Sequence, residues 1–128
     1  MKFVKQKHKD GCAIASLAMV TGLSYDKVLH KVHPNYLKYK CASVKIKNLS
    51  KLLCKFNINN ELIVPINFKK LDTSALVILI SSLTGQKENH LVVWNYKKQK
   101  IYDPIGIITG RVRSYERGAF ILIKLTNK

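Results

Sequence analysis

The chain has 128 residues, enough for one domain with its own core, and 47% of them are hydrophobic, as in a globular protein. No apolar run reaches the roughly 18 residues of a membrane-spanning helix, and the basic start lacks the apolar core of a secretory signal. We therefore expect a single domain over residues 1–128 in the cytoplasm. Action in its own cell and delivery into a host cell both stay open.

The net charge of +16 is the strongest feature of the composition, and lysine greatly outnumbers arginine. Such a charge attracts acidic partners, either an acidic protein or a nucleic acid. The lysines are scattered and accompany no nucleic-acid-binding motif, which favours diffuse attraction over base reading. The three cysteines, Cys12, Cys41 and Cys54, are too widely spaced to predict a disulfide framework.

The first predicted element is a helix within Q-K-H-K-D-G-C-A-I-A-S-L-A-M-V-T-G, which runs from Gln6 to Gly22. Cys12 opens a run of good helix formers, Asp10 is expected to cap it, and Gly22 to end it. Backbone N–H groups and the positive dipole end at a helix N-terminus stabilise a thiolate. Cys12 is therefore a candidate nucleophile, with an ordinary buried cysteine as the alternative.

Two more helices follow, separated by an irregular polar segment. Apolar residues at helical spacing predict them from Ser24 to the residue before Pro34, and from Ser43 to about Phe56. His30 and His33 could share a face of the first of these. Surface histidines are the favoured interpretation, because no further ligand stands near them, and we expect no metal and no cofactor.

After Asn57 the pattern changes to that of strands. The predicted strands are 61–64, a buried central strand within 71–82 around the apolar run 75–80, 90–96, 101–102, a short strand or bulge at 105–109, and 119–125. A polar loop is expected at 81–89 and a basic turn region at 111–118. Helices followed by an antiparallel sheet form an α+β fold, with the N-terminal helices packed on the C-terminal sheet.

A cysteine nucleophile needs a base, and the base needs a group that orients it. His90 begins the strongest predicted strand, and Asp103 ends the strand expected to pair with it, so Asp103 can orient His90 and stabilise its imidazolium. A hairpin turn centred at about 98.5 would place Asp103 opposite Trp94, so a direct His90–Asp103 pair would need a bulge or a neighbouring strand. Gln6 could curl back and, with the Cys12 backbone N–H, form an oxyanion hole. A surface glutamine is the plainer interpretation of Gln6.

These residues resemble peptidase family C39, the papain-like cysteine peptidases that remove double-glycine leaders from bacteriocin precursors. The resemblance rests on Gln6, Asp10, Cys12, the run A-S-L-A-M-V-T-G, H-L-V-V-W and Y-D-P, in that order, and covers about residues 4 to 125. It implies a papain-like fold in a stand-alone form. It also implies that Cys12 is the nucleophile, His90 the general base and acid, Asp103 its orienting group and Gln6 the oxyanion donor.

The chain also departs from that family. Its sequence reads Asp10-Gly11-Cys12 where the transporter-type motif commonly reads Asp-Cys-Gly, and Ser16 stands where a second cysteine is often found. It has no transmembrane region and no phosphate-binding P-loop, so it is not a bacteriocin transporter, and specificity for a Gly-Gly leader does not follow.

The leading hypothesis is a cysteine hydrolase that cleaves a peptide bond of a protein or peptide substrate through a thioester. The same triad could instead deamidate a glutamine of a target protein. A non-catalytic, basic C39-like module that binds an acidic protein or nucleic acid is the second class of function. A plain nucleic-acid-binding protein is less favoured, because most aromatic residues lie in core-like runs. The loop 81–89 and the segment 105–118 flank His90 and Asp103 and are expected to wall the cleft.

Overall fold

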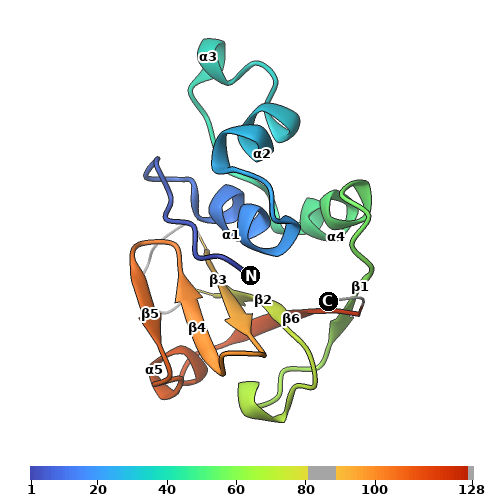
Figure 1. Ribbon diagram of the computed structural model, residues 1–128, viewed down its shortest axis with the longest axis vertical. Helices are drawn as coiled ribbons and strands as arrows, with labels where there is room; N and C mark the ends of the chain where they lie inside the picture. The colour runs from blue at the N-terminus through green and yellow to red at the C-terminus, as the bar shows by residue number, and fades with distance from the viewer. Residues whose placement is uncertain (81–88, 127–128) are drawn as a thin grey trace.

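The computed structural model describes residues 1–80 and 89–126, with a group of helices followed by a sheet (Figure 1). The helices are α1 Cys12–Thr21, α2 Tyr25–Val32, α3 Tyr36–Tyr39 and α4 Ile46–Lys55. The strands are β1 Asn60–Ile63, β2 Ala75–Leu79, β3 His90–Asn95, β4 Lys100–Asp103, β5 Ile107–Thr109 and β6 Phe120–Leu125, with the 3₁₀ helix η1 Phe68–Lys70 and the short helix α5 Arg113–Glu116 between strands. The predicted α+β class is confirmed.

Helix α1 begins at Cys12 and ends as predicted, because Gly22 takes a left-handed φ of 78° and donates its N–H to the Ala18 carbonyl. The predicted Asp10 cap is wrong. Gly11 occupies the cap position without a side-chain bond, and the Asp10 carboxylate accepts from the Ala42 backbone N–H at 3.0 Å. The Asp10 carboxylate, which we expected to cap α1, therefore binds a backbone N–H far along the chain.

The next helices follow the predicted order with different boundaries. Ser24 caps α2 by accepting from the Lys27 N–H at 3.2 Å, as expected. The segment predicted as irregular contains the short helix α3, and α4 begins three residues later than the predicted Ser43. The delay arises because the cap residue Lys45 has an extended backbone, with φ −70° and ψ 137°.

All strand pairs are antiparallel, and the strand order is β1-β6-β2-β3-β4-β5. Strand β2 lies inside this sheet, and both of its faces are covered. Leu76 and Ile78 belong to a core shared with α1, α2 and α4, whereas Ala75 and Val77 belong to a second core with Phe68, Trp94 and Leu122. Burial on both faces explains the unbroken apolar run in this strand.

The predicted hairpin exists, but its predicted register is wrong. Trp94 lies opposite Ile101, and Asn95 opposite Lys100, so Asp103 is not the partner of Trp94. The turn closes earlier because Gln99 adopts a left-handed φ of 53° and donates its N–H to the Tyr96 carbonyl. Lys100, which we expected in the turn, therefore belongs to β4 and pairs with Asn95.

The remaining predicted elements are found with small shifts of their ends. The strands predicted at 61–64, 105–109 and 119–125 are β1, β5 and β6, and the basic region 111–118 contains α5. The predicted loop at residues 81–89 lies outside the described residues, except for Asn89. In the described part of the chain, no single helix is both long and apolar enough to cross a bilayer; α1 and α2 pass that test only as a pair bent by 113°.

Candidate active site

Cys12 lies at the first turn of α1 and is partly exposed, whereas residues 13–20 behind it are buried. The residue before it must be small. A Cβ on Gly11 would collide with the Tyr25 hydroxyl and would stand 3.1 Å from the His8 carbonyl oxygen. His8 in turn shares a 2.9 Å hydrogen bond with Tyr25. This close contact between the start of α1 and the start of α2 fixes the position of the thiol.

His90 and Asp103 form the hydrogen bond that the sequence suggested. The Nε2 atom of His90 lies 2.7 Å from Oδ1 of Asp103, whose side chain is 4% exposed. The observed register explains the pair without a bulge. Continuing from Trp94 opposite Ile101, Asp103 falls opposite Val92, so His90 is its diagonal neighbour on the same face of the sheet.

The thiol of Cys12 reaches this pair from the helix layer. Helix α1 packs against β3, and Cys12 lies near enough to His90 to be one of the groups that raise the pKa of its imidazole. Because Asp103 holds Nε2, the other ring nitrogen, Nδ1, is the one that remains for a further partner. The structure therefore brings together three residues from α1, β3 and β4.

The electrostatics of the site favour a charged His90. Burial by itself opposes the imidazolium, but the hydrogen bonds and charges of Asp103 and Cys12 outweigh it and raise the pKa of His90 from 6.5 to about 9. Burial likewise works against the Asp103 carboxylate, yet His90 and the other donors hold the pKa of Asp103 below its usual range. At neutral pH His90 is thus an imidazolium beside a carboxylate.

Asp103 has two further donors that sequence reasoning did not identify. The backbone N–H of Ile105 donates to Oδ1 at 3.2 Å, and the Tyr115 hydroxyl donates to Oδ2 at 3.0 Å. Burial and the Asp103 charge raise the pKa of Tyr115 to about 12, so its hydroxyl keeps its proton. Tyr115 lies in a segment that reads as a basic turn, and nothing in its spacing pointed to Asp103.

Gln6 lies at the site through its backbone and its side chain. Its N–H donates to the Pro104 carbonyl at 2.8 Å, next to Asp103. Its side-chain nitrogen donates to the carbonyls of His8 and Lys9 at 2.9 and 3.1 Å, while its buried oxygen has no partner among the described residues. The amide therefore shapes the loop before Cys12. As an oxyanion donor it would have to redirect one of these bonds.

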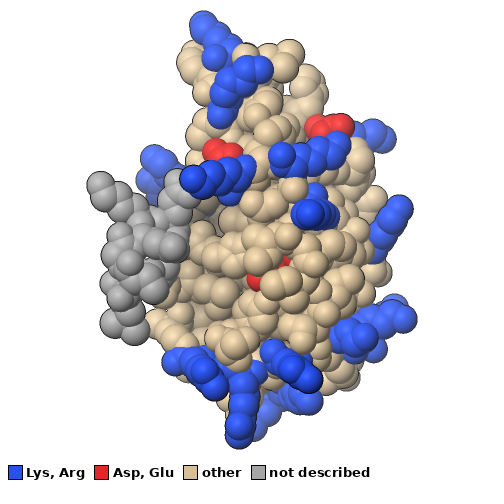
Figure 2. Space-filling model, turned by 90° about the vertical axis from the view of Figure 1, so that its left-hand side faces the viewer, with Lys and Arg blue, Asp and Glu red and all other residues tan. Residues whose placement is uncertain are grey.

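The segment expected to wall the cleft contributes to the site in part. Residues 105–118 supply the two extra donors to Asp103 and expose the isoleucines Ile105, Ile107 and Ile108. Figure 2, which views the molecule from the β5 side of Figure 1, shows Lys and Arg mainly around a broad middle, in which one small acidic patch is visible. The other expected wall, residues 81–88, lies outside the described part.

The remaining cysteines and histidines are separate from this cluster. Cys41 and Cys54 are exposed, and His33 hydrogen-bonds to the Ser43 carbonyl oxygen at 2.7 Å. In the described ranges, no three His, Cys, Asp or Glu side chains gather where a metal ion could bind.

A scan against protein-family models found no match, and a search of curated proteins found no significant relative. Inference about function therefore rests on the site: a helix-terminal cysteine, a charged histidine and a buried aspartate in an α+β protein.

Proposed function

We propose that the chain is a cysteine hydrolase of papain-like type that cleaves peptide bonds in a protein or peptide substrate. Cys12 is the nucleophile, His90 the general acid and base, and Asp103 the group that orients His90. The observation that carries the proposal is the 2.7 Å hydrogen bond between His90 and Asp103, on an imidazole whose pKa is raised by both Asp103 and Cys12. An imidazolium beside a sulfur atom favours the thiolate, which is the reactive form of cysteine.

The reaction would proceed in two halves. The Cys12 thiolate attacks the carbonyl carbon of the substrate amide, the C–N bond breaks, and His90 gives its proton to the leaving amine. This leaves a thioester and a neutral imidazole. His90 then takes a proton from water as the water attacks the thioester, which releases the carboxylic acid and restores the starting pair.

Negative charge develops on the carbonyl oxygen in both halves. The first backbone N–H groups of α1, including that of Cys12, have no partner inside the helix and can donate to this oxygen. Gln6 is the proposed side-chain donor, once one of its bonds to His8 or Lys9 is redirected to the substrate.

Thiol labelling tests the activated cysteine. Cys41 and Cys54 are exposed, whereas Cys12 is only partly so; accessibility alone would therefore label Cys12 slowest. Activation should reverse that order toward iodoacetamide near neutral pH, and His90→Ala should slow Cys12 but neither of the others. Equal rates, or an unchanged rate in the His90 variant, would contradict the proposal.

Mass spectrometry of candidate proteins tests the reaction itself. Incubation with the wild-type chain should produce cleaved peptides, and Cys12→Ala should not. A gain of about one mass unit without cleavage would indicate deamidation of glutamine by the same triad. A reactive Cys12 with neither product across acidic protein substrates would favour the binding-module alternative.

A further inference from the structure

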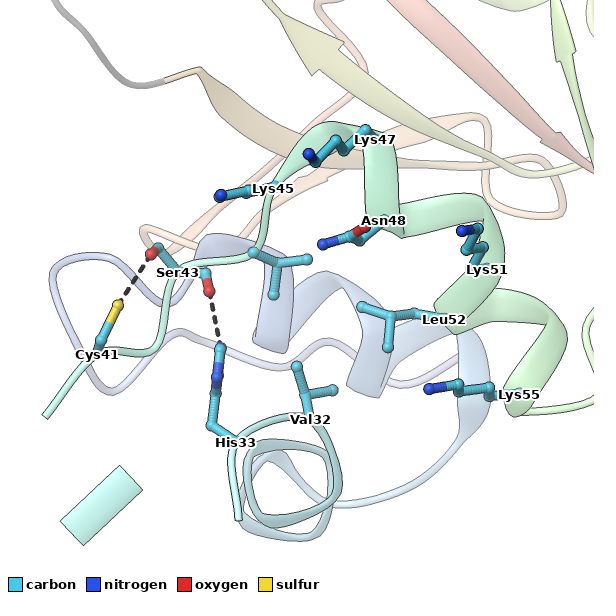
Figure 3. Close-up of a pocket in the computed structure, with 11 residues that line it drawn as sticks. Val32, His33, Cys41, Ser43, Lys45, Lys47, Asn48, Lys51, Leu52 and Lys55 are labelled. Atoms are coloured by element: carbon cyan, nitrogen blue, oxygen red, sulfur yellow. Dashed lines mark hydrogen bonds between the residues drawn. The ribbon is translucent and has the colours of Figure 1, made fainter. Parts of the chain in front are cut away.

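The helix layer carries a second hollow that contains none of Cys12, His90 and Asp103. It is a pocket of about 670 Å³ between the end of α2, the segment before α4, and α4 itself (Figure 3). We name it the lysine groove and define it by its rim, Lys47, Lys51 and Lys55, and its floor, Val32, Val44 and Leu52. Its volume is in the range of sites that hold ligands.

The rim concentrates positive charge along one face of a helix. The three rim lysines are spaced four residues apart, so they lie on one side of α4 and span about 12 Å. Lys45 also lines the groove, beside the uncapped N-terminus of α4. Among the described residues, no carboxylate lines the groove and no ion pair engages these lysines. Like charges at this spacing destabilise the free helix, and an anionic partner would relieve the repulsion.

The floor is apolar and its walls are held in place. Val32, Val44 and Leu52 are each partly exposed, and Leu52 and Val32 approach each other across the groove in Figure 3. His33, at the end of α2, binds the Ser43 carbonyl oxygen at 2.7 Å, which fastens the segment before α4 to α2. The groove thus presents fixed apolar surface between the two helices, with exposed lysine side chains along one edge.

The chemistry of the groove distinguishes between two kinds of acidic partner. Nucleic acid is typically held by aromatic rings that stack on bases and by arginines that grip phosphates in pairs of hydrogen bonds. Among the described residues, no arginine and no Phe, Tyr or Trp lines this groove, and the one imidazole there, that of His33, is bonded to the Ser43 carbonyl oxygen. An apolar floor beside separate lysines instead matches a peptide with leucine-like side chains on one face and carboxylates on the other.

We propose that the lysine groove binds an acidic, amphipathic peptide segment of a partner protein. The apolar side chains of the segment would lie against Val32, Val44 and Leu52, and its carboxylates would pair with the rim lysines. This proposal does not depend on the hydrolase proposal, because binding can be measured in the Cys12→Ala variant, which lacks the proposed nucleophile.

A fluorescent peptide of about 15 residues, with glutamates on one helical face and leucines on the other, is a suitable probe. Fluorescence anisotropy would follow its binding to Cys12→Ala protein. Adding Lys47→Gln, Lys51→Gln and Lys55→Gln should weaken binding about tenfold, from three exposed charge pairs. Adding Leu52→Ser should also weaken binding, since it removes apolar contact without changing the charge.

The matched control is the triple variant Lys97→Gln, Lys98→Gln and Lys100→Gln. It removes the same charge from exposed positions on the hairpin of β3 and β4, and binding should change less than about twofold. Equal loss in both triple variants would overturn the proposal in favour of unspecific attraction. So would an unchanged affinity after Leu52→Ser, or an oligonucleotide of equal charge that binds more tightly than the peptide and displaces it from the groove.

Discussion

Asp103 accepts hydrogen bonds from residues both near to it and far from it in the sequence. Oδ1 accepts from His90 and from Ile105, and Oδ2 accepts from Tyr115. A carboxylate with both oxygens occupied cannot rotate freely, so its orientation, and with it that of His90, is set by residues from several elements. Tyr115 is the one side-chain donor to Oδ2 that the described residues show, and it can be removed without touching the proposed triad.

We expect Tyr115→Phe to lower both the stability of the protein and the reactivity of Cys12. The change deletes the hydroxyl but keeps the ring, leaving a buried carboxylate oxygen without its donor, at a cost of about 1–3 kcal/mol. The rate of Cys12 alkylation should fall as His90 loses orientation, and urea denaturation should show the lost stability. Tyr39→Phe is the control, because Tyr39 is exposed and belongs to α3, which lies in the helix layer of Figure 1 and not beside β4. Equal effects of the two variants would deny Tyr115 this role.

At the level of residues, the sequence predicted the site residues that lie at the ends of helices and strands. Cys12 begins a helix, His90 begins a strand and Asp103 ends one, and each position can be read from a local pattern. The roles of Tyr115 and Asp10 depend on partners far away in the chain. No local pattern encodes a bond from Tyr115 to Asp103 or from Ala42 to Asp10, because these bonds exist only after the layers have packed.

Among the elements, the close contact between the start of α1 and the start of α2 bears directly on the site. The chain before Cys12 passes so close to α2 that Gly11 leaves no room for a methyl group beside the Tyr25 hydroxyl. Helix α1 therefore cannot keep both its present position and a larger residue before Cys12. Displacing either helix would move the thiol relative to His90.

We expect Gly11→Ala to destabilise the protein by about 1–3 kcal/mol through this overpacking and to slow Cys12 alkylation. Gly118→Ala is the matched control, because a Cβ there has nothing within 4 Å, and it should leave both measurements unchanged. Adding Tyr25→Phe to Gly11→Ala should restore part of the stability, since the colliding hydroxyl is gone. Equal behaviour of the two alanine variants in urea denaturation would contradict the steric explanation.

For the helices and strands, hydrophobic periodicity predicted the type and order of the elements better than it predicted where each element ends or how the strands pair. The buried strand β2, the N-cap Ser24 and the C-cap Gly22 followed from apolar pattern and capping chemistry. The hairpin register depended on the left-handed backbone conformation of Gln99. Glutamine is not a residue type that is typical of this conformation, so the sequence did not predict the turn. The late start of α4 likewise follows from the extended backbone of Lys45, which lines the lysine groove. This conformation is part of the tertiary structure and has no local sequence signal.

For the whole molecule, the charged state of His90 couples the site to global stability. Its pKa is 6.5 when unperturbed and about 9 in the fold, so the folded state binds a proton more tightly. The resulting stabilisation is fully present below about pH 6.5 and is lost as pH rises through 9. Asp103 affects stability in the opposite direction. Its pKa is lowered in the fold, so its contribution to stability is lost when the carboxylate becomes protonated in acid.

The free energy of unfolding should therefore fall by about 1–3 kcal/mol between pH 6.5 and pH 9.5, less than the full pKa shift implies, because the His90 side chain is 32% exposed. Urea denaturation at both pH values would measure it. His90→Gln should flatten this dependence, which separates His90 from other groups that titrate in the same window. A wild-type curve parallel to that of the variant would show that His90 is not charged in the folded protein.

One hydrogen bond described above, from the Gln6 backbone to the Pro104 carbonyl, joins the first residues of the chain to the loop after β4. During synthesis the segment with Cys12 emerges before the strands with His90 and Asp103. Until then the cysteine has neither its imidazole nor the loop that secures its approach. The thiol reactivity that we propose for Cys12 would thus appear only after β4 has been made, and a nascent or truncated product ending before β4 would lack it.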